Sequence, residues 1–165
     1  MKTPKRSVDG ARSWIERRRD LLSIYAEAEA SLPARDCMRS TGCCRFALTG
    51  REPHVTQAEV DLLLEHLASQ GRRVPPPRRD GACPFLAGDE TTCTVYEARP
   101  FGCRTHFCRE AGGPVPAREL RISLRRLAEL EEQLGSRAQG PRPMSGALGV
   151  KGKALRKLTP ADRTR

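Results

Sequence analysis

Aromatic residues are scarce in this sequence of 165 residues: Phe, Trp and Tyr make up 4% of it, and hydrophobic residues of all kinds make up 38%. Burial alone stabilises a domain with so few large apolar side chains only weakly, so we expect another constraint on the fold. No apolar run is long enough to cross a bilayer, and the basic start MKTPKRSVDGARSWIERRRD lacks the apolar segment of a secretory signal. The sequence therefore predicts a cytoplasmic protein without membrane contacts, in which thiols stay reduced.

The formal net charge of +10 is concentrated at the two ends of the sequence. Residues 1–20 hold seven Lys and Arg against three Asp and Glu, and residues 136–165 hold eight against one. A nucleic-acid-binding domain normally carries its basic patch on the folded surface, and the middle of this chain is nearly balanced. Weak contact of the basic tail with nucleic acid or an acidic protein is therefore kept only as an alternative.

Three segments, residues 11–32, 57–69 and 116–135, show the apolar spacing of amphipathic helices. Thr56 and Glu59 form a capping box at the start of the second segment. The spacing predicts a mainly α fold with irregular Cys-rich loops and few or no short strands, in one small metal-nucleated domain over residues 11–135. A flexible basic N-terminus (1–10) and a disordered basic tail (136–165) are expected to flank it. The expected apolar faces comprise Trp14, Leu21, Leu22, Tyr25 and Leu32; Val60, Leu63, Leu64 and Leu67; and Leu120, Leu124, Leu127, Leu130 and Leu134.

Seven cysteines lie between these helices, in loop-like segments rich in Gly, Pro, Thr and Arg. They are Cys37, Cys43, Cys44, Cys83, Cys93, Cys103 and Cys108. A disulfide framework is disfavoured because their number is odd and adjacent cysteines pair only with strain. Inert buried thiols would be expected on the apolar faces of the helices. Metal binding by this pool of cysteines is the interpretation we favour, and the spacing alone leaves zinc and iron both open.

Arginines directly follow several of the cysteines, as Arg45 and Arg104 do. A neighbouring cation lowers the pKa of a thiol and offsets the negative charge of a thiolate site. We expect Arg45, Arg99 and Arg104 to act in this way around the bound metal. His106 is weighed as an additional ligand, but an indirect or structural role is favoured for it.

The segments GCCR at 42–45, CPFL at 83–86 and CTVYEARPFGCRTHFC at 93–108 closely resemble the YkgJ-like family of CxxCxxCC zinc- or iron-chelating domains. The resemblance covers residues 37–108 and implies that the cysteines bind zinc or an iron–sulfur cluster, with [4Fe–4S] as the first cluster type. One departure is Ser40, which stands where the family has its second cysteine and is a far poorer ligand for a soft metal.

The expected function is that of a cytoplasmic metal-binding protein, with a redox role as one extension of it. One alternative is a structural-zinc module that binds nucleic acid or acidic partners through its basic ends. Another is a cluster-dependent methylase or an iron–sulfur oxidoreductase, which some relatives suggest. The sequence contains no glycine-rich nucleotide loop and no Cys-x3-Cys-x2-Cys run of radical enzymes, so it leaves open whether the protein is an enzyme.

Overall fold

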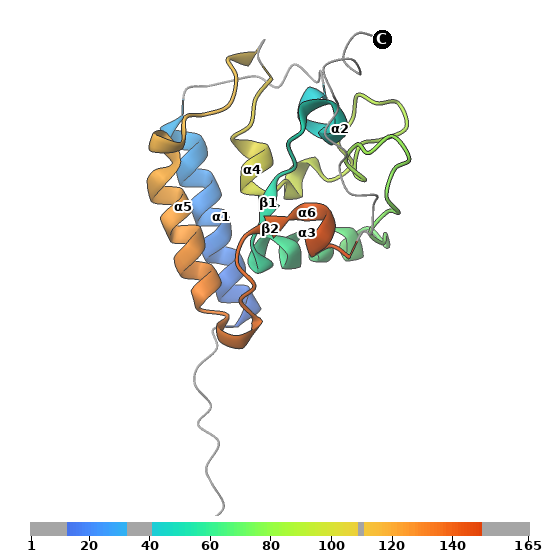
Figure 1. Ribbon diagram of the computed structural model, residues 1–165. Coiled ribbons are helices and arrows are strands. Elements are labelled where there is room, and N and C mark those ends of the chain that lie inside the picture. The colour runs from blue at the N-terminus through green and yellow to red at the C-terminus, as the bar shows by residue number, and fades with distance from the viewer. Residues whose placement is uncertain (1–12, 33–40, 109–110, 150–165) are drawn as a thin grey trace, which may run out of the picture.

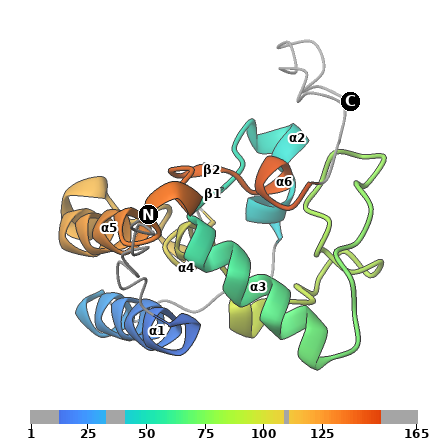
Figure 2. The ribbon, with the colours of Figure 1, turned by 90° about the horizontal axis from the view of Figure 1, so that it is seen from below.

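The computed structural model describes residues 13–32, 41–108 and 111–149. Its three long helices are α1 (Trp14–Ser31), α3 (Gln57–Ser69) and α5 (Ala117–Glu132). Helices α1 and α5 lie side by side, and α3 packs against both of them (Figures 1 and 2). The predicted mainly α fold with three amphipathic helices is therefore confirmed.

Short elements connect and cover these helices. They are η1 (Gly42–Cys44), α2 (Phe46–Thr49), β1 (His54–Val55), η2 (Tyr96–Ala98), α4 (Phe101–Arg104), η4 (Gly135–Arg137), β2 (Arg142–Pro143) and α6 (Met144–Ala147). Strands β1 and β2 pair antiparallel, with His54 opposite Pro143 and Val55 opposite Arg142. Within the described ranges, no helix is long and apolar enough to span a membrane.

Capping boxes start both α1 and α3. Ser13 accepts a hydrogen bond from the Glu16 amide at the start of α1, and Thr56 does the same with Glu59 at the start of α3. In each box the glutamate carboxylate also accepts a hydrogen bond from the backbone amide of the capping residue. Both helices therefore begin where a side chain satisfies amides that have no partner inside the helix.

Helix α3 separates two apolar clusters. One face of it packs with the loop half of the domain, in a cluster that includes Leu63, Leu67 and Phe85. Its other face, with Ala58 and Leu62, packs with the residues between α1 and α5. The expected apolar face of α3 is wrong at Leu64, which is 43% exposed, because the second buried face lies on the side of Ala58 and Leu62.

Two further expectations need correction. Leu124 of α5 is 44% exposed, because α5 buries only the narrower face formed by Leu120, Leu127 and Leu130. Residues 136–149, which we expected to belong to a disordered tail, continue through η4, β2 and α6. Met144 is 1% exposed in the loop-side cluster, so apolar burial and strand pairing hold this segment on the domain. Residues 1–12 and 150–165 lie outside the described ranges.

Candidate metal centre

Five of the seven cysteines line a single cavity of about 380 Å³. They are Cys43, Cys44, Cys83, Cys93 and Cys103. Much of the remaining wall is formed by apolar side chains of the loop-side cluster, among them Phe46, Phe85 and Val95. Cys108 is partly buried but does not line this cavity. Cys37 and Ser40 lie outside the described residues.

The turn of η1 presents Cys43 and Cys44 together. The Cys44 amide donates to the Thr41 carbonyl over 2.8 Å, and the Arg45 amide donates to the Gly42 carbonyl over 3.1 Å. In this tight turn the two sulfur atoms are 3.9 Å apart. The Cys83 amide donates to the Cys44 carbonyl over 2.7 Å, so the second cysteine segment is attached directly to the first.

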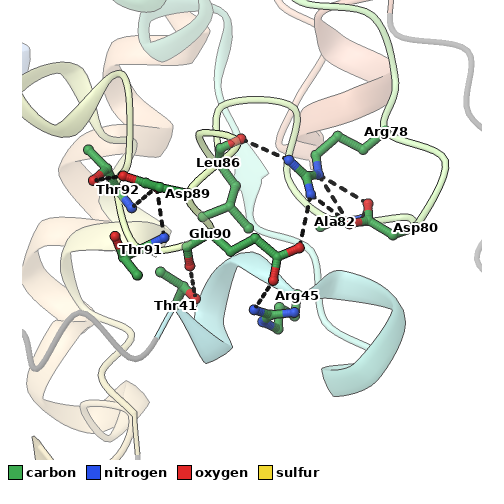
Figure 3. Close-up of polar contacts among 10 residues, drawn as sticks. All are labelled: Thr41, Arg45, Arg78, Asp80, Ala82, Leu86, Asp89, Glu90, Thr91 and Thr92. Carbon is green, nitrogen blue, oxygen red and sulfur yellow. Dashed lines mark hydrogen bonds and ion pairs between the residues drawn. The ribbon is translucent and has the colours of Figure 1, made fainter.

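A polar clamp holds the loop before Cys93 against η1 (Figure 3). The Thr41 hydroxyl donates to the Glu90 carbonyl over 2.8 Å, and the Arg45 guanidinium pairs with the Glu90 carboxylate over 2.7 Å. Arg78 approaches the same carboxylate at 3.5 Å and pairs with Asp80 at 2.7 Å. Thr41 and Glu90 both have a left-handed backbone, with φ of 52° and 58°, which costs roughly 1–2 kcal/mol for a residue with a side chain. Contacts across the clamp offset that cost.

Cys93 itself follows a turn that Asp89 closes. The Asp89 carboxylate accepts hydrogen bonds from the amides of Thr91 and Thr92, over 2.9 Å and 3.1 Å, and from the Thr92 hydroxyl over 2.9 Å. These bonds hold the pKa of Asp89 below its ordinary value. An isolated antiparallel bridge then pairs Cys93 with Leu86 and returns the chain to the cavity.

Helix α4 places Cys103. Its start is fixed by Glu59 of α3, whose carboxylate accepts a hydrogen bond from the Phe101 amide over 2.7 Å. Arg104 binds the preceding backbone, donating to the Glu97 carbonyl over 2.6 Å and to the Arg99 carbonyl over 2.8 Å. Its guanidinium also lies 4.5 Å from the centre of the Tyr25 ring of α1.

The three arginines expected to offset the site charge make different contacts. Arg45 pairs with Glu90, and Arg104 binds backbone carbonyls and Glu29. Arg99 lines the cavity and stacks 3.6 Å from the centre of the Tyr96 ring, and its charge opposes part of the rise in the pKa of the Cys43 and Cys103 thiols that hydrogen bonding and burial cause. Of the three arginines, only Arg99 lines the cavity, whereas Arg45 and Arg104 contact the loops around it; charge compensation at a bound metal stays a prediction.

The cavity disfavours free thiolates. The hydrogen bond with Cys44, followed by burial, raises the pKa of the Cys43 thiol far above its ordinary value. The hydrogen bond with Cys43 lowers the pKa of Cys44, but its bond with Cys83 and burial together raise that pKa to about 12. Burial, followed by the charges of neighbouring thiols, strongly raises the pKa of Cys103. Thiols in this environment are protonated at neutral pH, so a binding metal ion has to displace their protons.

The five thiols of the cavity are suitable ligands for a soft metal ion, although their sulfur atoms do not lie in a coordination geometry. In the part of the chain that the structure describes, no three Cys, His, Asp or Glu side chains are already arranged to hold a metal. The pair Cys43 and Cys44 comes nearest. Two thiolates on one tetrahedral zinc, with Zn–S bonds of about 2.3 Å, lie about 3.8 Å apart, close to the 3.9 Å observed here.

A second cavity of about 350 Å³ lies beside the first. Cys43 and Cys103 line both cavities, and the second is also bordered by Arg51, His54 and His106. Burial, followed by the charge of Arg51, lowers the pKa of His106. His106 therefore lies near Cys43 and Cys103 but does not line the cavity that the five cysteines share.

Sequence reasoning missed the residues that bring the cysteine segments together. Glu90 and Arg78 carry no local signal, because the ion pairs of Glu90 with Arg45 and with Arg78 join different segments of the chain. Glu59 was recognised only as part of a capping box. A glutamine would complete a capping box equally well, so the glutamate at position 59 is only a weak sign of a further role.

Comparison with known proteins agrees with the chemistry of this cavity. The family model "CxxCxxCC: Putative zinc- or iron-chelating domain" matches residues 36–123, slightly more than half of the chain. The matched region includes every cysteine that lines the cavity. No curated protein and no solved structure matched the chain.

Proposed function

Because this chain belongs to the CxxCxxCC family of zinc- or iron-chelating domains, we propose that its cavity cysteines bind one metal ion through thiolates, with zinc as the preferred occupant. The observation that carries the proposal is the convergence of five cysteines from separate segments on one cavity. Cys43, Cys44, Cys83 and Cys103 are the first choice of ligands, and Cys93 is the alternative fourth ligand.

The spacing of the adjacent pair favours a single ion over a cubane cluster. A [4Fe–4S] cluster takes four cysteines on four irons, one thiolate to each, whereas Cys43 and Cys44 are close enough to share one metal. A [2Fe–2S] cluster, with two thiolates on each iron, is the second candidate because it also accommodates a close pair.

The bound ion would act as a cross-link between loops. It offsets part of the thiolate charge and joins η1, the segment at Cys83 and α4, whose backbones otherwise meet through few hydrogen bonds. Around it, the clamp at Glu90 holds the loops in place, and Arg99 offsets the remaining negative charge. The apolar side chains on part of the cavity wall reduce the contact of the sulfur atoms with water, most completely at the buried Cys83.

Cysteine substitutions test the proposal directly. Protein purified without oxygen should hold one zinc per chain and be colourless, and Cys44→Ser or Cys103→Ser should abolish stoichiometric binding after dialysis. Cys108→Ser is the matched control, since Cys108 does not line the cavity, and it should retain the metal. Wild-type metal content in the first two variants would exclude this cavity as the site.

Spectroscopy separates zinc from iron. A brown sample with thiolate-to-iron charge-transfer bands and acid-labile sulfide would establish an iron–sulfur centre in place of zinc, and would make a redox role the next hypothesis. Hydrogen exchange after addition of a chelator should lose protection around η1 and α4, while α1 and α5 keep theirs. Loss of protection everywhere, or nowhere, would contradict the local cross-link.

A further inference from the structure

Glu59 is a buried carboxylate that joins three helices. It is 2% exposed, and each of its oxygen atoms accepts two hydrogen bonds. One oxygen accepts from the Thr56 amide over 2.8 Å and from the Thr56 hydroxyl over 3.0 Å, which completes the capping box of α3. The other accepts from the Tyr25 hydroxyl of α1 over 3.0 Å and from the Phe101 amide of α4 over 2.7 Å.

Helix capping alone does not require this arrangement. The capping box of α1, formed by Ser13 and Glu16, uses the same residue types on an exposed surface. A glutamine also completes such a box. At Glu59, however, each carboxylate oxygen accepts from a backbone amide, one from Thr56 and the other from Phe101, so a glutamine would place its NH₂ group against one of these two donors. The carboxylate therefore serves a purpose beyond the start of α3.

This further role of Glu59 concerns the position of α4. Phe101 is the first residue of this short helix, and Cys103 follows two residues later. The amides of Cys103 and Arg104 donate to the Pro100 carbonyl, so the first turn moves as one unit with the Phe101 amide. The Phe101 ring stacks with the Tyr25 ring at 6.2 Å between centroids, and this contact holds the same turn from the side. Glu59 thus fixes both the position and the rotation of the turn that carries Cys103.

We propose that Glu59 is a positioning residue of the metal centre, which holds α4 so that the Cys103 sulfur faces the cavity shared with Cys43 and Cys44. This inference rests on the proposed metal-binding function. It assigns to a residue of α3, outside the cysteine motifs, an indirect effect on ligand geometry. The chain of contacts runs from the carboxylate through the Phe101 amide to Cys103.

The test uses the full chain and cobalt(II), whose visible absorption reports the number and geometry of thiolate ligands. Replacing Glu59 by glutamine places the side-chain NH₂ group against the backbone amide of Thr56 or of Phe101, both of which are donors. We expect Glu59→Gln to bind cobalt about 10- to 100-fold more weakly, as is typical when a residue that supports a ligand is changed. Its spectrum at saturation should also differ from that of the wild type, because Cys103 no longer reaches the ion in the same geometry.

Two control variants separate positioning from stability. Glu16→Gln alters the exposed capping box of α1, and Leu127→Ala opens a void between α1 and α5. Both should leave the cobalt spectrum at saturation unchanged, although Leu127→Ala lowers the free energy of unfolding. A wild-type spectrum and affinity in Glu59→Gln, or the same spectral change in Leu127→Ala, would overturn the proposal.

A second variant and a metal-free measurement keep the inference independent of the proposed function. Tyr25→Phe removes one donor and retains the ring, so if Glu59→Gln does not fold, a smaller spectral change in Tyr25→Phe carries the test. In the metal-free protein, Glu59→Gln should raise the rate at which iodoacetamide alkylates Cys103 relative to Cys108. If wild-type protein binds no metal, the proposed function fails, while an unchanged alkylation ratio is what refutes positioning by Glu59.

Discussion

Replacing Arg104 by lysine tests whether the structure identifies the main anchor of the α4 loop. The side chain of Arg104 is 13% exposed, and its guanidinium donates to two backbone carbonyls, those of Glu97 and Arg99, and to the Glu29 carboxylate. An arginine reaches all three acceptors because its donors spread across a rigid plane. A lysine ammonium is a compact charge, so it can keep the charge above Tyr25 but cannot serve both carbonyls and Glu29.

The magnitude follows from the bonds that are lost. A hydrogen bond to a charged group contributes about 1.5–3 kcal/mol, and the lysine is expected to lose one or two of them, at the partly buried Arg99 carbonyl and the more exposed Glu97 carbonyl. The free energy of unfolding should therefore fall by about 2–4 kcal/mol. The pair with Glu29 contributes little, since that carboxylate is largely exposed, so Glu29→Gln should cost less than about 1 kcal/mol.

Urea unfolding of the metal-free protein, followed by circular dichroism and extrapolated linearly to water, measures both changes. Metal-loaded protein gives a second comparison, in which Arg104→Lys should also weaken metal retention, because the loop that carries Cys103 has lost its anchor. A loss below about 0.5 kcal/mol for Arg104→Lys, or an equal loss for Glu29→Gln, would refute the assignment of the carbonyl contacts as the anchor.

Two further changes probe the clamp and the core. The hydrogen bond from Arg78 lowers the pKa of Asp80 from 3.8 to about 2, so its stabilisation is present above pH about 4 and is lost as the pH falls towards 2. Asp80→Asn should flatten the dependence of the unfolding free energy on pH in that window, and an unchanged slope would contradict the pairing. Phe85→Ala should cost about 3–5 kcal/mol in urea unfolding because this ring is fully buried between the cavity and α3, and a cost below about 1 kcal/mol would be inconsistent with that packing.

Local patterns predicted the long helices because their signals are local. The box formed by Thr56 and Glu59 fixed the start of α3, and periodic leucines marked α5. The same patterns failed for Leu64 and Leu124, since the spacing of apolar residues does not reveal which sides of α3 and α5 meet their neighbours in the fold. Burial depends on the partner of a helix, and the sequence of one helix does not contain that information.

The site shows the same division between local and long-range information. The sequence placed all seven cysteines in loop segments, and five of them line one cavity, while their role as metal ligands stays a prediction. The contacts that bring them together join distant residues: Glu90 with Arg45, and Glu59 with Phe101. Residues 136–149 were misjudged for a related reason. Strand β2 forms only because β1 offers it a partner, and Met144 is buried only because the loop-side cluster receives it.

The position of Cys43 and Cys103 between two cavities has a consequence for the kinetics of metal exchange. Both sulfur atoms border a second hollow with basic side chains, so an incoming thiol or chelator can approach them without separating α3 from the loops. At the proposed metal centre, we expect such a reagent to displace Cys43 and Cys103 first and the other cysteines afterwards. Exchange of the metal would then proceed stepwise from one side, while the fold around Cys83 stays closed.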